Sequence, residues 1–263
     1  MHPPDRGSWM QLPTLGENDV RLFFACTNPQ FFLPISSLLW QWISEAERSR
    51  YYRYVFEKDR STFLLGRGLL RYVVGHYSGQ SPQQVVFSEG RYGRLFLDRT
   101  PELSFNLSHS HEVVCIAISR SFRVGVDIEF SDPFRAQLDI ADQFFTMEEC
   151  STIRSSAPDE RHLAFFRLWT LKEAYIKCIG KGLSIPLNSF QFRFSDQGIG
   201  IDFMRRATDA VSHWDWRFHS WRCRDYSVGL AISSEARLNR SATTTSFRME
   251  SGLSFSRMLD SFR

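Results

Sequence analysis

The strongest constraint on the fold is a pattern that occurs twice along the chain. Residues 111–119 read HEVVCIAIS and residues 225–233 read DYSVGLAIS, and both runs are apolar enough to predict buried strands. Each run closes a stretch in which predicted helices are followed by predicted strands. Unrelated buried strands also match over such short lengths, so duplication is a hypothesis. We therefore expect an α+β fold of two similar halves, 20–122 and 123–233.

The first half carries the local signals of a strand, two helices and a small sheet. Residues 20–26 predict the strand, and Ser44 with Glu47 three residues on is typical of a capping box that starts a helix. A second helix is predicted from Asp59 to Tyr77, and Gly79 provides its stop. Short segments rich in β-branched and aromatic residues then predict strands at 85–87, 95–97, 103–107, 113–119 and 124–130. The last of these strands belongs to the second half.

The second half repeats this order. Its helices are predicted near 134–144, 147–155 and 159–179, and its later strands at 190–194, 214–222 and 226–233. Residues 234–263 are rich in Ser, Thr and Arg without sustained periodicity, so we expect a mobile tail, with a short helix near its end as the alternative. Residues 1–19 are expected to form an N-terminal extension.

Charge and cysteine content exclude several classes of protein. The chain has 32 Lys and Arg against 29 Asp and Glu, so no general basic surface for nucleic acid is expected, and any polyanion that it binds must be small. The five cysteines have no C-x-x-C spacing, which argues against a disulfide framework and a structural zinc site. The best apolar run, 113–118, is too short to span a membrane. We expect a cytoplasmic protein with no membrane or nucleic-acid partner.

Three carboxylates are candidates for a metal site. Asp127 and Glu129 lie two residues apart on a predicted strand, so both leave the same face while Val126 and Ile128 face the core. With Glu173 from a predicted helix, they would offer the oxygen ligands that Mg²⁺ prefers, and Mg²⁺ bridges phosphates. The alternative is a polar strand face neutralised by nearby arginines.

The helix that carries Glu173 also carries Lys177, one turn further on. The alternative to a functional role is an ordinary salt bridge between the two side chains. That alternative does not explain Gly180-Lys181-Gly182 directly after the helix, where the glycines allow a close backbone approach beside a lysine. A phosphate partner would explain both features.

The segment FNLSHSH places Ser108 and Ser110 on one strand face and His109 and His111 on the other. A zinc site would need a third ligand at metal spacing, and a serine hydrolase would need a G-x-S-x-G elbow; the sequence shows neither. The remaining interpretations are a structural histidine, or a hydroxyl and an imidazole that donate to phosphate oxygens. Most basic side chains simply solvate the surface, but if the halves meet face to face, a cleft between them would collect several around the three carboxylates. The candidates are Arg48, Arg50, Arg67, Arg91, Arg94, Lys172, Lys177 and Lys181.

Three motifs taken together resemble those of Sfp-type 4′-phosphopantetheinyl transferases. They are FNLSHS at 105–110, GVDIE at 125–129 and WTLKEAYIKCIGKGL at 169–183, and their order and spacing also match. Weaker similarity extends from the predicted helix of Arg48 through LLGRGLLR at 64–71 to Ser233.

The resemblance implies a pseudo-twofold pair of α+β halves with coenzyme A in an active-site cleft between them. In this family, a serine hydroxyl of an apo acyl or peptidyl carrier protein attacks the β-phosphate of Mg²⁺-bound coenzyme A, and adenosine 3′,5′-bisphosphate is released. Mn²⁺ is an alternative metal. A monomer is implied because the two halves already form the interface.

The resemblance also assigns roles to residues. The metal ligands fall on Asp127, Glu129 and Glu173, and the candidates for the base are Glu173 and Glu149, which lies in FFTMEE. Lys177 would stabilise developing charge near the diphosphate. The coenzyme A contacts fall on basic and polar side chains: Arg48, Arg50, Arg67, Arg94, Ser108, His109, Lys177 and Lys181.

One departure from the family concerns the usual Gly-Lys-Pro, because this chain has Gly93-Arg94-Leu95. The proline's fixed φ is lost, and Arg is not a neutral replacement for Lys at a phosphate. Two other hypotheses remain: a non-catalytic module that binds coenzyme A or a nucleotide, and a Mg²⁺-dependent phosphotransferase that acts on a small metabolite.

Overall fold

The computed structural model describes residues 12–133, 138–204, 214–234 and 246–250. The first half comprises β1 (Asp19–Cys26), α1 (Pro29–Trp42), α2 (Glu45–Tyr51), α3 (Glu57–Ser78), β2 (Ser88–Glu89), β3 (Leu95–Phe96), β4 (Ser104–Ser110) and β5 (Val113–Ser119). The second half comprises β6 (Arg123–Phe130), α4 (Leu138–Phe144), α5 (Met147–Ser155), α6 (Arg161–Ile179), β7 (Phe190–Ser195), β8 (Gly198–Phe203), β9 (Asp215–Cys223) and β10 (Tyr226–Ser234). Two 3₁₀ turns, Gly182–Ser184 and Leu187–Ser189, connect α6 to β7.

The two halves share one connectivity. In the first, β5 pairs antiparallel with β1 and β4, and in the second, β10 pairs antiparallel with β6 and β9. In the first half, the long helix α3 lies in sequence between β1 and the antiparallel pair β2–β3. In the second half, the long helix α6 lies between β6 and the antiparallel pair β7–β8. The expectation of an α+β fold with two similar halves is confirmed.

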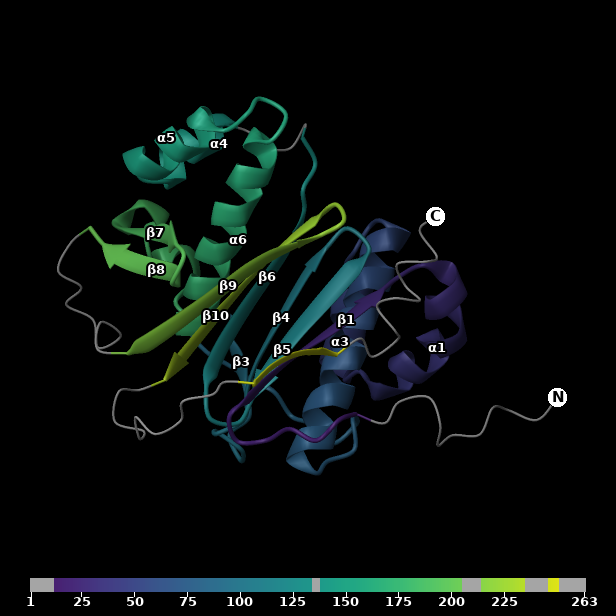
Figure 1. Cartoon of the computed structure of the whole chain (residues 1–263). Helices are drawn as coiled ribbons and strands as arrows, with labels where there is room; N and C mark the ends of the chain where they lie inside the picture. The colour runs from purple at the N-terminus through teal and green to yellow at the C-terminus, as the bar shows by residue number, and fades with distance from the viewer. Residues whose placement is uncertain (1–11, 134–137, 205–213, 235–245, 251–263) are drawn as a thin grey trace.

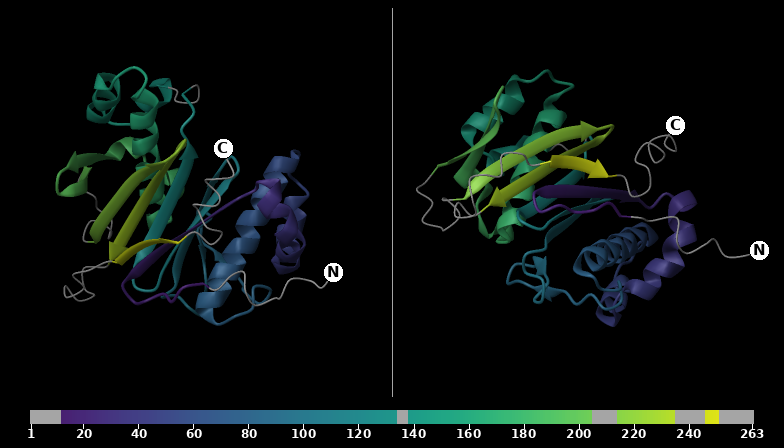
Figure 2. Two further views of the ribbon diagram at one scale, coloured as in Figure 1. Left: turned by 45° about the vertical axis from the view of Figure 1, so that its right-hand side comes forward. Right: turned by 60° about the horizontal axis from the view of Figure 1, so that its bottom comes forward.

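The two sheets pack against each other between layers of helices (Figures 1 and 2). Their shared core is made mainly of aliphatic side chains from β1, β5, β6 and β10, such as Val20, Leu22, Ala117, Val126 and Leu230. A second apolar core joins α1 and α3 to the first sheet, and a third joins α6 to the second sheet. Each sheet is therefore covered on both faces, one by its own helices and one by the other sheet.

Local sequence signals account for most helix ends. Ser44 and Glu47 form the predicted capping box at the start of α2, with Ser44 N–H donating to Glu47 Oε2 at 2.8 Å. Gly79 ends α3 in the left-handed conformation, with φ of 71°. Thr146 and Glu149 form a second capping box, at α5.

Some expectations differ from the structure. Helix α1, which begins with Pro29 and continues through Pro34, was not predicted from the sequence. Strand β8 was missed because its sequence, GIGIDF, carries two glycines. His111 lies in the turn between β4 and β5 with φ of 50°, not on a strand. In the tail, where no fixed structure was expected, strand β11 (Ser246–Glu250) pairs parallel with β1; the alternative helix near the end lies outside the described residues.

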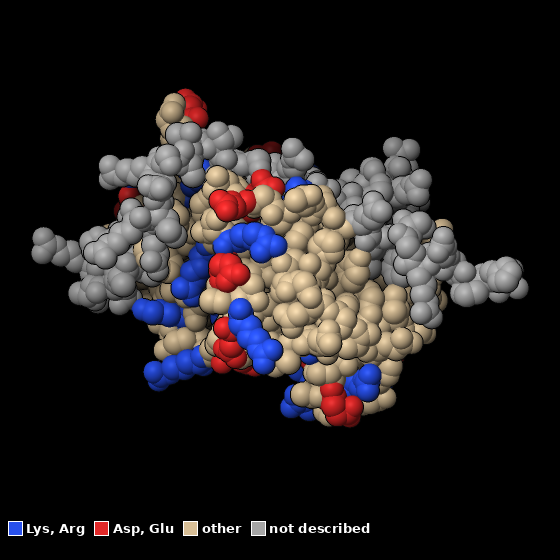
Figure 3. All heavy atoms as spheres, turned by 90° about the horizontal axis from the view of Figure 1, so that it is seen from below, with Lys and Arg blue, Asp and Glu red and all other residues tan. Residues whose placement is uncertain are grey.

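One face of the molecule carries charged side chains of both signs (Figure 3). On the face shown in Figure 3, basic side chains alternate with acidic ones and form no continuous basic surface. All five cysteines are free thiols. None of the helices in the described ranges has the length and apolarity needed to cross a bilayer.

Candidate active site

The two halves meet along a polar seam between β4 and β6. Every second side chain of β4 accepts a hydrogen bond from the backbone N–H of every second residue of β6. Side chains therefore take the place of backbone–backbone hydrogen bonds between these two strands. The pairs are Ser104 with Val124 (3.1 Å), Asn106 with Val126 (2.9 Å), Ser108 with Ile128 (3.3 Å) and Ser110 with Phe130 (3.0 Å). The seam therefore fixes the register between the first half and the strand that carries the predicted metal ligands.

The same serines hold two of the three carboxylates. Ser108 Oγ donates to Asp127 Oδ1 at 2.8 Å, and Ser110 Oγ donates to Glu129 Oε2 at 2.8 Å. Val126 and Ile128 lie in the core between the sheets. The structure therefore places Asp127 and Glu129 on one face of β6, and both carboxylates face the seam.

Helix α6 reaches this face because glycines line its path. A Cβ on Gly125 would lie 2.1 Å from the Ala174 carbonyl oxygen, and one on Gly229 would lie 2.4 Å from Thr170 carbonyl atoms. The helix backbone therefore rests directly on β6 and β10. This approach brings Lys177 to Asp127, with 2.5 Å between Nζ and Oδ1, and to Ser108 Oγ at 3.0 Å.

The carboxylates of this cluster lie close enough to shift one another's pKa values. Burial, followed by the charge of Asp127, raises the pKa of Glu173 to about 6 and that of Glu129 to about 7. Burial alone would lower the pKa of Lys177, but Asp127, Glu173 and Glu129 outweigh it and raise the pKa. The three carboxylates and Lys177 thus form one coupled group.

The donor set of this group fits a divalent cation. Asp127 is only 3% exposed, and its Oδ2 is a buried oxygen with no hydrogen-bond partner among the described residues. A hard cation would satisfy that oxygen and offset the excess negative charge. Within the described ranges, no three His, Cys, Asp or Glu side chains are already arranged as a metal site. Lys177 occupies the other oxygen of Asp127, so some rearrangement would accompany binding.

A cavity of about 250 Å³ lies on the other side of β4. Arg50, Arg67 and His109 line it, together with Phe63 and the 93–95 segment. Burial, followed by the charge of Lys177, lowers the pKa of His109, and burial also lowers that of Arg67. All of the lining residues belong to the first half, whereas the expected cleft drew on both halves. The second half contributes the carboxylate cluster, one strand away.

Four of the residues predicted to contact coenzyme A do not line this cavity. Arg48 packs on Trp40 and donates to its carbonyl oxygen at 3.2 Å. Lys181 follows α6, where its carbonyl oxygen accepts from Ser184 Oγ. Neither is among the described residues that line the cavity. Ser108 and Lys177 belong to the carboxylate cluster.

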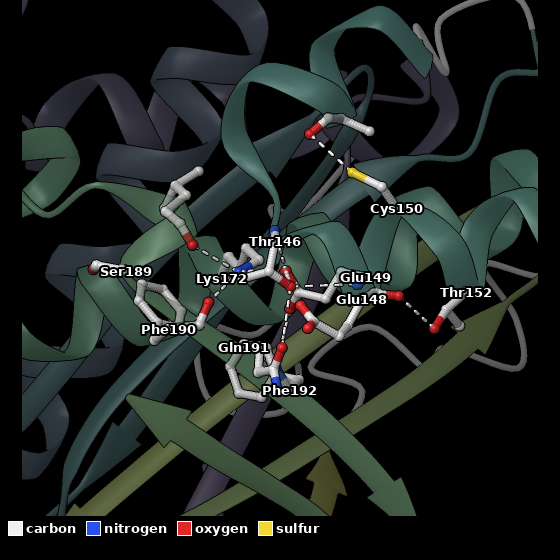
Figure 4. A network of polar contacts seen from close by, with 12 residues as sticks. Thr146, Glu148, Glu149, Cys150, Thr152, Lys172, Ser189, Phe190, Gln191 and Phe192 are labelled. Atoms are coloured by element: carbon white, nitrogen blue, oxygen red, sulfur yellow. Dashed lines mark hydrogen bonds and ion pairs between the residues drawn. The ribbon is translucent and has the colours of Figure 1, made fainter. Parts of the chain in front are cut away.

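Glu149, one of the two predicted bases, lies in a separate buried network (Figure 4). Its Oε2 pairs with Lys172 Nζ at 2.8 Å and also accepts from the Thr146 main chain, while Oε1 accepts from Phe192 N–H at 3.0 Å. Lys172 is fully buried and donates to the carbonyl oxygens of Leu187 and Phe190. The network ties α5 and α6 to β7, and Glu149 shares no described contact with the carboxylate cluster.

Arg94 spans the halves. Its guanidinium donates to the carbonyl oxygens of Lys177 and Val124 and to Ser104 Oγ. Atoms of Arg94 also line the cavity. The predicted coenzyme contact is thus engaged with main-chain acceptors of the second half.

Some residues of the site were not predicted from the sequence. Asn106 both lines the cavity and accepts from Val126, and Tyr54, Thr62 and Phe63 complete the cavity wall. The alternation of polar residues at 104, 106, 108 and 110 was a usable signal for the seam, since apolar Phe105 and Leu107 lie between them. No comparable signal marked Tyr54 or Phe63.

Comparisons with known proteins find related sequences for both halves of the chain. The 4′-phosphopantetheinyl transferase superfamily matches residues 123–231, and the family of 4′-phosphopantetheinyl transferase N-terminal regions matches residues 35–121. A 4′-phosphopantetheinyl transferase of Bacillus subtilis is 35% identical over 157 residues, which cover 59% of this chain and 68% of the relative.

Two further relatives extend the comparison. The 4′-phosphopantetheinyl transferase Sfp of Bacillus subtilis strain 168 is 36% identical over 59% of this chain and 68% of its own length. The human L-aminoadipate-semialdehyde dehydrogenase-phosphopantetheinyl transferase is 27% identical over 76% of this chain and 69% of its own length. The chain belongs to the 4′-phosphopantetheinyl transferase family and is a transferase.

Proposed function

We propose that this protein transfers the 4′-phosphopantetheine group of coenzyme A to a serine hydroxyl of an apo acyl or peptidyl carrier protein, with adenosine 3′,5′-bisphosphate as the second product. The observation that carries the proposal is the placement of a basic cavity and a carboxylate–lysine cluster on opposite faces of β4. One strand thereby presents His109 to the cavity and Ser108 to the cluster.

The cavity is suited to the nucleotide end of coenzyme A. Arg50 and Arg67 offer guanidinium groups to phosphate oxygens, which they bind well because a fork of N–H donors matches the phosphate geometry. His109 is kept neutral at pH 7 by its lowered pKa and still carries one N–H donor. Ser108 already uses its hydroxyl within the protein, so its part would be to orient Asp127 and Lys177.

Asp127, Glu129 and Glu173 would hold Mg²⁺ or Mn²⁺, which when bound supplies charge neutralisation at the diphosphate. Lys177 stays cationic because of its raised pKa, and it would stabilise charge that develops on the leaving phosphate. Ser110 would hold Glu129 in place through its hydrogen bond.

Of the two candidate bases, Glu173 is the better placed. It lies in the coupled group with Asp127 and Lys177, where burial and the charge of Asp127 raise its pKa to about 6. Both carboxylate oxygens of Glu149 are already engaged in the α5–α6–β7 network. We therefore propose Glu173 as the base.

Mass spectrometry of purified apo acyl and peptidyl carrier proteins tests the proposal. After incubation with this protein, coenzyme A and Mg²⁺, a carrier serine should gain about 340 Da, the mass of the phosphopantetheine group. Coenzyme A binding without a mass shift on any carrier would favour the non-catalytic binding module. Failure to bind coenzyme A would overturn the proposal.

A further inference from the structure

Arg94 joins three structural elements with a single side chain. One nitrogen, Nη1, donates to the Lys177 carbonyl oxygen on α6. The other, Nη2, donates to Ser104 Oγ on β4 at 3.1 Å and to the Val124 carbonyl oxygen on β6 at 3.2 Å. Because Ser104 Oγ also accepts the Val124 N–H, Arg94 completes the end of the β4–β6 seam.

The Lys177 carbonyl needs a partner because α6 ends there. The last carbonyl groups of a helix have no intrahelical donors, and they form the negative end of the helix dipole. Gly180 has a left-handed backbone, with φ of 80°, and its N–H donates to the Ile176 carbonyl oxygen. The guanidinium of Arg123 donates to the Ile179 carbonyl oxygen at 3.1 Å. Two arginines from outside the helix thus cap its final turn.

Packing reinforces this arrangement. A Cβ on Gly180 would lie 2.7 Å from Arg94 Cδ, so the Arg94 stem lies directly against the helix cap. Arg94 is partly buried, and burial lowers its pKa to about 10, which leaves it cationic at neutral pH. A partly buried cation with hydrogen bonds to three elements resists displacement, because moving it would leave several acceptors unpaired.

The position of α6 decides the geometry of the cluster. Lys177 lies in the last turn of the helix and Glu173 one turn earlier. We propose that Arg94 is a positioning residue, which ties the C-terminal turn of α6 to the seam and so places Lys177 and Glu173 against Asp127, and that binding a phosphate is not its main role. The proposal rests on the proposed transferase function for its kinetic consequences.

Lysine would not serve this role equally well. Arg94 reaches its acceptors from two nitrogens separated by the width of the guanidinium, whereas an ammonium places all its donors on one atom. The leucine at 95 also leaves the segment free of proline's constraint on φ. The Arg94→Lys variant is therefore expected to keep the charge and lose the bridge.

The test compares Arg94→Met and Arg94→Lys with Arg123→Met, a matched control that removes a guanidinium cap from the same helix end. Affinity for adenosine 3′,5′-bisphosphate is measured by calorimetry at two salt concentrations, and amide exchange of 174–180 is measured without ligands. For both Arg94 variants we expect the dissociation constant to change by less than about threefold and exchange to accelerate by about tenfold or more. The kcat should fall by about tenfold while KM for coenzyme A changes little.

Arg123→Met should accelerate exchange only at the last residues of α6 and leave kcat within about threefold of wild type. A nucleotide affinity that drops by about tenfold with a reduced salt dependence, with exchange and kcat unchanged, would overturn the proposal and identify Arg94 as a phosphate ligand. Wild-type protein that modifies no carrier would refute the proposed function, and the exchange and calorimetry measurements would still decide the role of Arg94.

Discussion

Asp127 joins Lys177 and Ser108 within the carboxylate cluster. Its Oδ1 accepts from Lys177 and Ser108, while its buried Oδ2 has no partner among the described residues. An asparagine has nearly the same shape but lacks the charge, so it separates the electrostatic role from packing.

The first prediction is that Asp127→Asn abolishes transfer. If Asp127 holds the metal as proposed, its loss removes several kcal/mol of transition-state stabilisation, so kcat/KM should fall by about 10³-fold or more at saturating Mg²⁺. The measurement is carrier modification followed by mass spectrometry. Asp202→Asn, which breaks a surface pair with Arg193, is the control and should keep wild-type turnover. Near-normal turnover of Asp127→Asn would refute the assignment.

Glu149 gives a contrasting prediction at the residue scale. Glu149→Gln leaves Lys172 buried without its counter-charge, so the free energy of unfolding should drop by about 3 kcal/mol, measured by urea denaturation. The folded fraction should keep kcat within about threefold of wild type, because Glu149 lies outside the cluster. Asp142→Asn, at an exposed pair with Arg154, should change stability by less than about 1 kcal/mol. Full folding with lost turnover would instead identify Glu149 as the base.

At the scale of elements, the contact between α6 and β6 depends on the absence of a side chain at Gly125. A Cβ there would lie 2.1 Å from the Ala174 carbonyl oxygen and 2.4 Å from the Cys178 nitrogen, and these backbone atoms of α6 include no flexible group that could move. The helix would have to shift away from the strand, and Glu173 and Lys177 would move with it.

Gly125→Ala should therefore lower both stability and activity. We expect a loss of about 3 kcal/mol in the free energy of unfolding, measured by denaturation, and a fall in kcat beyond what the unfolded fraction explains. Gly200→Ala on β8 is the matched control, because nothing lies within 4 Å of its added Cβ, and it should change stability by less than about 1 kcal/mol. Equal effects of the two substitutions would contradict the close-approach argument.

Elements with local signals were predictable, and those that depend on tertiary contacts were not. The capping box of Ser44 and Glu47 located α2 and Gly79 located the end of α3, because these signals act within one turn, and the helical pattern of the sequence located α5. Helix α1 contains Pro34, which local rules disfavour, and β8 contains glycines that lower strand propensity. The alternation on β6 predicted that Asp127 and Glu129 share a face, but no local rule links Arg94 to a carbonyl 83 residues away.

At the scale of the whole molecule, the proposed nucleotide and metal sites draw on different halves. Every described residue that lines the cavity belongs to the first half, while the three carboxylates and Lys177 belong to the second. The halves share one core between their sheets and the polar seam of β4 with β6, so neither half presents a complete site. Nucleotide binding and metal binding should therefore be separable by mutation.

Thermal shifts test this division. Adenosine 3′,5′-bisphosphate alone should raise the Tm of wild type and of Asp127→Asn alike, and should lose this effect in Arg50→Met, because Arg50 lines the cavity. Mg²⁺ alone should stabilise wild type and Arg50→Met but not Asp127→Asn. A ligand at about 100 times its Kd adds about 2.7 kcal/mol of stability, which is readily detected as a change in Tm. Loss of nucleotide stabilisation in Asp127→Asn would show instead that the seam couples the two halves into one binding unit.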